Sequence, residues 1–236
     1  MTCPKEELFL GYNMNSIMEA VRLVCNEVRN NSKHGTSFQK LLTTLRREFK
    51  KQDFKIKITS ERDKHLAPEE FYVNAYYDPD DDSKSEIAIE VIVHHNFDKD
   101  NIWDKVHVTD FLIQIFDATV HEFKHQRQSK KRYFQIFLEH PGTEPYRDYL
   151  QDPDEIDAYS LSIAIELCRT LGKFRALRYM PTFTKLARFK IQNQFVSPNL
   201  HAYVSHFETL NTPILKRLAK KVYVRLQKLD TDAIFV

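Results

Sequence analysis

The sequence has few glycines and few cysteines, and both shortages narrow the range of folds. Only 4 of the 236 residues are glycine, which disfavours a turn-rich all-β fold or a glycine loop for a nucleotide and favours long helices. The 3 cysteines are Cys3, Cys25 and Cys168, which lie too far apart for a Cys-x-x-Cys zinc knuckle and do not suggest a disulfide framework. We therefore expect a helix-rich protein of the reducing cytoplasm.

Long apolar runs and a dominant charge are also missing. No stretch approaches the roughly 20 apolar residues that a membrane span needs, and the N-terminus lacks the basic and then apolar order of a signal peptide. We therefore expect no membrane partner. The formal net charge of +2 gives no general attraction to nucleic acid, so that partner is disfavoured, although a local basic patch stays open.

The residues that are present form an ordinary globular composition with two kinds of periodicity. Hydrophobic residues make up 42% and charged residues 29%, as in folded domains. Apolar positions at helical spacing predict helices over 15–30 and 37–51, and again from about Val106 through most of the C-terminal half. Alternation predicts three strands over 54–60, 71–77 and 86–95, with an acidic turn over 78–85. The fold class expected is α+β, helix-rich with a small three-stranded sheet.

The most informative motif is HEFKH, residues 121–125. Residues four apart on a helix lie one above the other, so His121 and His125 can present two imidazole nitrogens to one tetrahedral metal ion. Glu122 then lies beside the metal, where it can take the proton of an attacking water and deliver it to the leaving amine. The motif predicts a zinc site with both histidines as ligands and Glu122 as general acid/base.

A helical wheel separates these histidines from the apolar side of their helix. The residues that cluster opposite them are Leu112, Phe116, Thr119 and Phe123, and those that share their face are Gln114, Asp117, Ala118 and Gln128. The wheel disfavours a pair of core histidines. A solvated helix face stays open as the alternative to a metal site.

A catalytic zinc needs a third protein ligand and one open position. Asp152 suits an N-cap, Pro153 a first turn and Gly172 a stop, which predicts a helix over 153–171. Glu155 looks away from the apolar side of that helix and is the predicted third ligand. Asp152-x-x-Glu155 is equally a capping box, in which the glutamate would bond to the backbone of the helix start instead. Weaker alternatives for the ligand are Asp148, Asp157, Glu166 and His140.

These residues resemble the gluzincin branch of zinc metallopeptidases, whose pattern is H-E-x-x-H on one helix and a glutamate on a later one. They are also similar to zincin-like proteins encoded by phages. The resemblance covers roughly residues 86–172. It implies Zn2+ held by His121, His125 and Glu155, Glu122 as general acid/base, and a protein or peptide substrate. For a phage protein, the expected location is the host cytoplasm or the virion.

The resemblance also implies features around the site. In the zincin-like fold an edge strand precedes the active-site helix and bounds the substrate cleft, and residues 86–95 match this order. Asp117, one turn before His121, is a candidate partner of that histidine, although a solvent-facing carboxylate is the simpler interpretation. Such peptidases commonly stabilise the oxyanion with a Tyr or His. The candidates here are Tyr159, His201, Tyr203 and His206, and no motif selects one.

We expect three segments along the chain: an N-terminal helical segment (1–53), a zincin-like catalytic core (54–172) and a C-terminal helical segment (173–236). We expect them to pack together as one domain. In the last segment, LKRLAKKVYVRLQKL over 215–229 combines an apolar stripe with six cations. We interpret it as a packed helix with a solvated basic side, in preference to a nucleic-acid or membrane contact.

Two other functions stay open. A SprT-like DNA-associated protease would use a histidine such as His140 in place of Glu155 as zinc ligand, and separate substitutions of the two would distinguish them by bound zinc. A non-catalytic zincin-fold protein, serving in binding or in virion structure, would retain the metal without turnover and would tolerate Glu122→Gln.

Overall fold

The computed structural model is helix-rich with a small three-stranded mixed sheet, which confirms the α+β class. It describes residues 4–31, 35–52, 56–68, 70–78, 87–94, 96–98, 100, 102–132, 145–180, 196–207 and 212–234. The chain forms two compact units, Met1–Phe134 and Gln135–Ile234. The zincin-like identity of the fold and the three predicted segments stay predictions. Within the described ranges, no helix is long and apolar enough to cross a bilayer.

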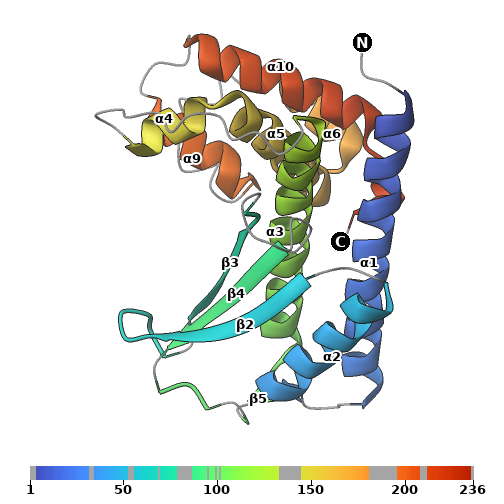
Figure 1. The fold of residues 1–236 in the computed structure, drawn as a ribbon, viewed down its shortest axis with the longest axis vertical. Helices are drawn as coiled ribbons and strands as arrows, with labels where there is room; N and C mark the ends of the chain where they lie inside the picture. Colours follow the sequence, from blue (N-terminus) through green and yellow to red (C-terminus); the bar gives the residue numbers. More distant parts are fainter. Residues whose placement is uncertain are drawn as a thin grey trace. The chain divides into compact units, whose positions relative to one another are not determined.

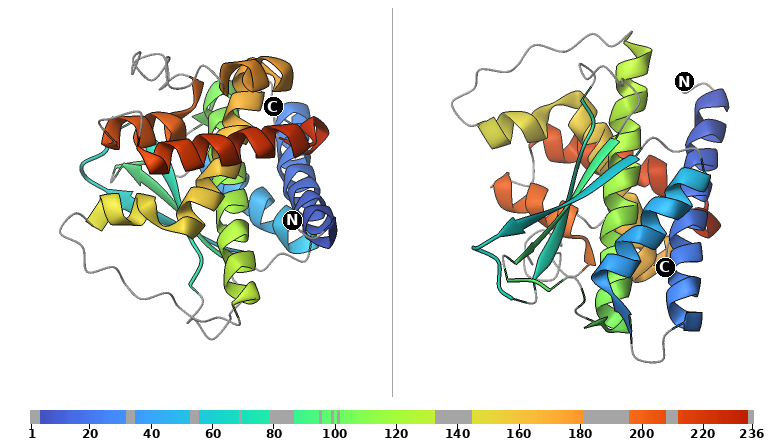
Figure 2. Two further views of the ribbon diagram at one scale, coloured as in Figure 1. Left: turned by 90° about the horizontal axis from the view of Figure 1, so that it is seen from above. Right: turned by 60° about the horizontal axis from the view of Figure 1, so that its bottom comes forward.

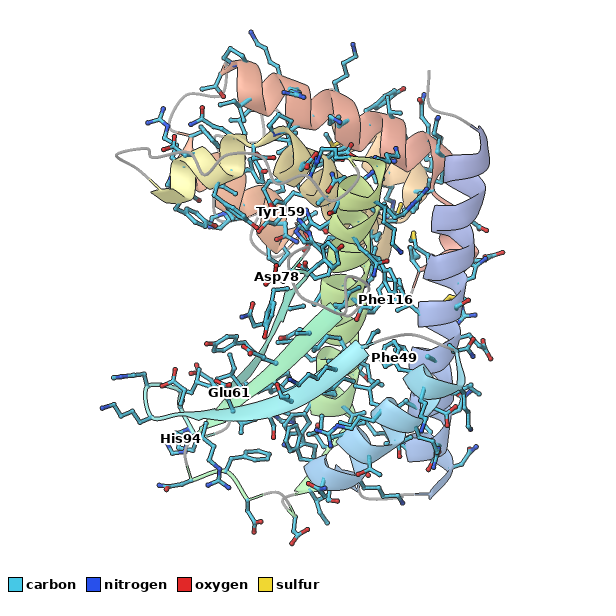
Figure 3. The ribbon with its side chains drawn as sticks, viewed as in Figure 1. Phe49, Glu61, Asp78, His94, Phe116 and Tyr159 are labelled. Carbon is cyan, nitrogen blue, oxygen red and sulfur yellow. The ribbon has the colours of Figure 1, made fainter. Side chains whose placement is uncertain are left out.

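Three helices form one side of the first unit: α1 (Pro4–Asn31), α2 (Phe38–Lys51) and α3 (Lys105–Lys131). The hydroxyl of Ser37 accepts a hydrogen bond from the Lys40 N–H at 3.3 Å and so begins α2 where its apolar stripe begins. α1 packs along both α2 and α3, as Figure 1 shows. The labelled Phe116 lies on the side of α3 that faces α1 (Figure 3), and its side chain is fully buried.

The sheet of the first unit has the order β2-β4-β3, from strands β2 (Ile56–Asp63), β3 (Phe71–Tyr76) and β4 (Ile87–His94). β2 runs parallel to β4, with Ile56 opposite Ile87, whereas β3 runs antiparallel to it, with Phe71 opposite Val93. The helices cover one side of this sheet in both views of Figure 2. All three predicted strands are therefore confirmed, and the predicted acidic turn over 78–85 lies mostly outside the described residues.

One expectation about the sheet is wrong. The strand before the active-site helix was expected at an edge, but β4 is the central strand and the edges are β2 and β3. The reason is visible in the burial of β4: Ile87, Ile89 and the run Val91–His94 are all buried. A strand that is paired on both sides has no open edge, and its side chains are more deeply buried than those of the strands at the edges.

A second, two-stranded sheet joins β1 (Thr36–Ser37) to β5 (Ile102–Trp103). Gly35 precedes β1 with a φ of +115°, and a Cβ at this position would lie 2.1 Å from the carbonyl oxygen of Trp103. The contact therefore requires glycine. Beneath it, the ring of Phe38 lies 5.0 Å from those of Phe97 and Trp103, in a buried aromatic cluster.

The second unit is helical in its described parts. Its elements are α4 (Pro145–Gln151), α5 (Pro153–Leu171), α6 (Lys173–Tyr179), α9 (Pro198–His206), α10 (Pro213–Lys228) and a short 3-10 helix, η2 (Thr231–Ala233). α10 packs against α5 (Figure 2). Its buried residues are Leu215, Leu218, Val222 and Leu226. The helix predicted over 153–171 is confirmed residue for residue, with Asp152 as N-cap and Gly172 as C-cap.

Candidate metal centre

Helix α3, which carries HEFKH, has a defined beginning and end. The carboxylate of Asp104 accepts a hydrogen bond from the His107 N–H at 2.9 Å and caps the first turn. Lys130 and Lys131 stand in the last turn, where cations interact favourably with the helix dipole. The motif therefore lies more than four turns after the first residue of α3 and a little under two turns before its last, well inside regular helix.

The predicted division of the α3 surface is confirmed. Leu112, Phe116, Thr119 and Phe123 are buried. His121 and His125 are partly exposed, as are Gln114, Asp117 and Ala118. Gln128 departs from the pattern because it is buried, as is Lys124, of which only 8% is exposed. The histidines are thus accessible from outside the apolar core of their own helix.

The two imidazoles turn their Nε2 atoms toward each other. These atoms lie 3.0 Å apart, and the ring centroids are 4.8 Å apart with planes inclined at 62°. Glu122 joins them: the nearest ligand atoms of His121, Glu122 and His125 all lie within 4.8 Å of one another. Among the described residues, this is the group of three that can hold a metal ion.

The spacing of the two nitrogens fits zinc. The two nitrogens are 3.0 Å apart. If each lay about 2.05 Å from a shared ion, the usual zinc–imidazole distance, the angle between the two nitrogen–ion directions would be about 94°. A tetrahedral angle of about 109° needs the nitrogens only about 0.3 Å further apart, which a small rotation of either ring provides. The donor set, two imidazoles with a neighbouring carboxylate, is also the kind that zinc prefers.

Glu122 combines proximity with restricted solvent access. Its exposed fraction is 9%, lower than that of either histidine. A carboxylate held close to a metal and away from bulk water suits proton transfer, because water competes less for its charge. The geometry therefore allows Glu122 to serve either as a general acid/base or as a further ligand.

Strand β3 runs beside the turns of α3 that carry the histidines, a relationship with no signal in the sequence. At one end, the Gln114 Oε1 atom accepts a hydrogen bond from the Val73 N–H at 3.2 Å. At the other end, the hydroxyl of Tyr77 approaches the side chain of Ser129, and burial raises the pKa of this hydroxyl. Gln114 lies two turns before His121 and Ser129 one turn after His125, so the end of β3 flanks the motif.

Glu155, the predicted third ligand, lies in the second unit, in the first turn of α5. The Asp152 N–H donates to the Tyr149 carbonyl oxygen at 3.1 Å, which satisfies the group that a capping-box glutamate would bond. The Asp152 carboxylate accepts from the Asp154 N–H at 2.6 Å. Glu155 itself accepts a hydrogen bond from the hydroxyl of Tyr149. Burial, Tyr159 and the Glu155 carboxylate all raise the pKa of that hydroxyl.

The weaker candidates for the third ligand are mostly occupied elsewhere. Asp157 binds two cations of α10, Lys221 at 2.7 Å and Arg225 at 3.0 Å. Glu166 is buried and accepts hydrogen bonds from Ser197 and from Asn199 at the start of α9. Asp148 is half-buried on α4, and His140 lies outside the described residues.

The candidates for oxyanion stabilisation also belong to the second unit. The Tyr159 ring packs edge-on against those of Tyr149, at 6.4 Å, and Tyr203, at 5.4 Å. Tyr203 is fully buried, and its hydroxyl has no hydrogen-bond partner within the described ranges. His201 contacts Ser205 at 3.3 Å, and His206 packs against Tyr146. The geometry of this unit selects none of the four.

The chain matches no known protein family, no curated protein and no solved structure.

Proposed function

We propose that this chain is a zinc-dependent metallopeptidase, with His121, His125 and Glu155 as zinc ligands and Glu122 as general acid/base. The observation that carries the proposal is the convergence of the His121 and His125 Nε2 atoms, 3.0 Å apart on one partly exposed helix face, with a carboxylate beside them. A hydrogen bond between the two imidazoles would also bring these nitrogens to 3.0 Å, so it is the nearly buried Glu122 beside them that favours a metal ion. Glu155 enters the proposal from the sequence pattern alone.

The chemistry follows from the position of each side chain. Zinc, when bound, polarises a substrate carbonyl and makes water a nucleophile near neutral pH. The Glu122 carboxylate accepts the proton of the attacking water and passes it to the amine nitrogen of the leaving group. His121 and His125 act through Nε2, which leaves each Nδ1 to bond a neighbouring group that fixes the ring.

Strand β3 lies at an edge of the sheet, and this edge offers a place for an extended substrate. The Val73 N–H points to Gln114 and not to β4. In an antiparallel strand every second residue directs its backbone N–H and C=O to the same edge, so those of Ala75 also point away from β4. The Val73 N–H is already bonded to the Gln114 side chain. The backbone groups of Ala75, nearer the histidines, are those that a peptide would bond in strand addition. The substrate class proposed is accordingly an unfolded or extended segment of protein.

The experiment measures zinc and hydrolysis separately in the full-length protein. Purified protein from zinc-replete cells should contain one zinc per chain, which His121→Ala should remove and the exposed His65→Ala should not. Glu122→Gln should retain zinc and lose cleavage of a denatured protein substrate by at least about 100-fold. Glu155→Gln should lower zinc affinity, whereas substitution of His140 should not.

Three outcomes would overturn parts of this proposal. Wild-type protein without zinc would remove the metal site. A Glu122→Gln variant that cleaves as fast as the wild type would remove the assigned base, and loss of zinc on substituting His140 but not Glu155 would support the SprT-like ligand set.

A further inference from the structure

The C-terminal part of the chain carries a concentration of positive charge that the net charge conceals. Between residues 169 and 228 there are 13 Lys and Arg residues and one acidic residue, Glu208, a formal charge of +12. Since the whole chain carries +2, the remainder carries −10. The molecule is therefore strongly polarised along its sequence, and the described part of this basic segment includes α6, α9 and α10.

The basic residues of helix α10 fall into two groups. Lys221 and Arg225 lie toward α5, where both bind the Asp157 carboxylate. Lys216, Arg217, Lys220 and Lys228 are exposed; we call these four residues the basic face of α10. Lys216, Arg217 and Lys220 form no ion pair with any acidic residue that the structure describes. The helix therefore needs two cations for packing and presents the others to solvent.

Helix stability does not account for the basic face. The first turn of α10 contains no acidic residue, and Lys216 and Arg217 follow it directly. Cations near this end of a helix oppose the positive end of the dipole instead of complementing it. A helix surface that served only stability would have acidic residues near this end, and acidic residues would alternate with the basic ones along it. The arrangement is better explained by a negatively charged partner.

The shape of the basic face fits a linear polyanion. From Lys216 to Lys228 the helix rises about 18 Å, a length over which one strand of B-DNA presents about five phosphates. α6 begins beside the end of α10, because the Lys173 Nζ donates to the Leu229 carbonyl oxygen at 2.7 Å. The next residues of α6 add an exposed aromatic ring, Phe174 at 73% exposure, with the Arg178 guanidinium 5.8 Å from its centroid. Cations next to an exposed ring are typical of surfaces that bind unpaired nucleotides.

A membrane is a poorer fit to the same residues. Amphipathic helices that lie on bilayers insert their apolar side between the lipids. The apolar side of α10 is already buried within its own unit, through Leu215, Leu218 and Val222. Attraction to an anionic bilayer would then rest on charge alone.

We propose that the basic face of α10 binds the phosphate backbone of nucleic acid, independently of the zinc site. The contact is sequence-independent, because it consists of flexible cations on a convex helix surface and has no pocket for a base edge. The neighbouring Phe174 favours single strands over duplex, since only an unpaired base can stack on it.

The experiment measures binding of the full-length protein to a labelled single-stranded oligonucleotide by fluorescence anisotropy, over a range of NaCl concentrations. A triple variant, Lys216→Gln, Arg217→Gln and Lys220→Gln, should bind at least about tenfold more weakly at low salt. Its plot of log K against log salt should lose a slope of about 2, the share of three phosphate contacts on a single strand. The matched control, Arg22→Gln, Lys40→Gln and Lys50→Gln, removes the same charges from exposed positions of α1 and α2 and should change binding little.

Two further arms identify the partner. Lys216→Arg with Lys220→Arg should retain wild-type binding, because the charges are kept. Vesicles containing phosphatidylserine should bind more weakly than the oligonucleotide at equal salt. The proposal is overturned by equal losses in the two triple variants, by no binding of the wild type at low salt, or by stronger binding to the vesicles.

Discussion

The Gln114 side chain joins helix α3 to strand β3: its Oε1 accepts from the Val73 N–H at 3.2 Å, while its Nε2 donates to Asp110 at 3.1 Å. The second bond fixes the orientation of the amide, so the oxygen is the atom that faces the strand. Gln114, two turns before His121, is therefore one of the side chains that hold the β3 edge beside the helix of the HEFKH motif.

Replacing Gln114 by Leu should loosen this edge. We expect a loss of about 1 kcal/mol, because the Val73 N–H loses its protein acceptor, and faster hydrogen exchange at the Val73 amide. Unfolding of the first unit can be followed through the fluorescence of Trp103, the only tryptophan of the chain. The control Gln39→Leu, at an exposed position of α2, should have little effect. Unchanged exchange at Val73 would contradict the role given to this bond.

The Tyr149 hydroxyl should matter for metal binding if Glu155 is a ligand. Tyr149→Phe removes the hydrogen bond that this hydroxyl gives to the Glu155 carboxylate, and loss of such an outer partner typically costs 10- to 100-fold in metal affinity. Competition with a zinc chelator measures the change. Tyr146→Phe, one turn earlier on α4, is the matched control. If both variants hold zinc as tightly as the wild type, the bond serves only the packing of α4 on α5.

Glu166 should be among the costliest polar residues to replace in the second unit. Its buried carboxylate accepts hydrogen bonds from the Ser197 hydroxyl and from the Asn199 side chain at 2.6 Å. Glu166→Ala leaves these donors without their acceptor, and we expect a loss of about 3 kcal/mol. Amide exchange in α9 reports it. Asp148→Ala, on the half-exposed part of α4, should change stability by less than about 0.5 kcal/mol.

Glu48 should make the stability of the first unit depend on pH. Burial raises the pKa of its carboxyl, but hydrogen bonds from Lys51 and Arg47 outweigh burial and hold it below the ordinary value of 4.5. A lowered folded pKa stabilises the protein above the unfolded value, and this contribution is lost as the pH falls through the folded value. Glu48→Gln should therefore lower the melting temperature at pH 7 and have a smaller effect below about pH 4. An effect that stays constant down to pH 3 would contradict this account.

Two glycines of the described ranges have a positive φ, and they should respond differently to alanine. At Gly35 the new Cβ would lie 2.1 Å from the Trp103 carbonyl oxygen, whereas at Gly172, with a φ of +75°, nothing lies within 4 Å. Gly35→Ala should cost about 3 kcal/mol or more, because the backbone must shift and separate β1 from β5. Gly172→Ala should cost about 2 kcal/mol, because a φ of +75° with a ψ of 149° is a backbone conformation that essentially only glycine adopts. If thermal unfolding showed equal losses of stability in the two variants, the backbone between β1 and β5 could shift to accept the new Cβ at little cost in free energy.

The sequence predicts elements well wherever local chemistry decides them. Helix α5 begins and ends as expected, because Asp152, Pro153 and Gly172 act on the backbone next to them. The place of β4 in the sheet was mistaken, because strand order depends on residues distant in the chain. β1 and β5 have two residues each, too few for any periodicity. In the candidate site, HEFKH is local, and the helical spacing places its two imidazoles side by side, whereas the bond between Gln114 and Val73 joins residues 41 apart and leaves no local signal.

The parallel pairing of β2 with β4 also has a consequence for how the first unit folds. β3 and β4 are neighbours in the chain and can pair within microseconds as a hairpin. β2 must wait for a partner that begins 31 residues after its own first residue, Ile56 opposite Ile87, and its loop must close before any bond is gained. On a ribosome, β2 emerges first and stays unpaired until β4 has left the exit tunnel. The interval during which this strand is open to pairing with another chain is therefore set by the rate of translation and not by the final stability of the sheet.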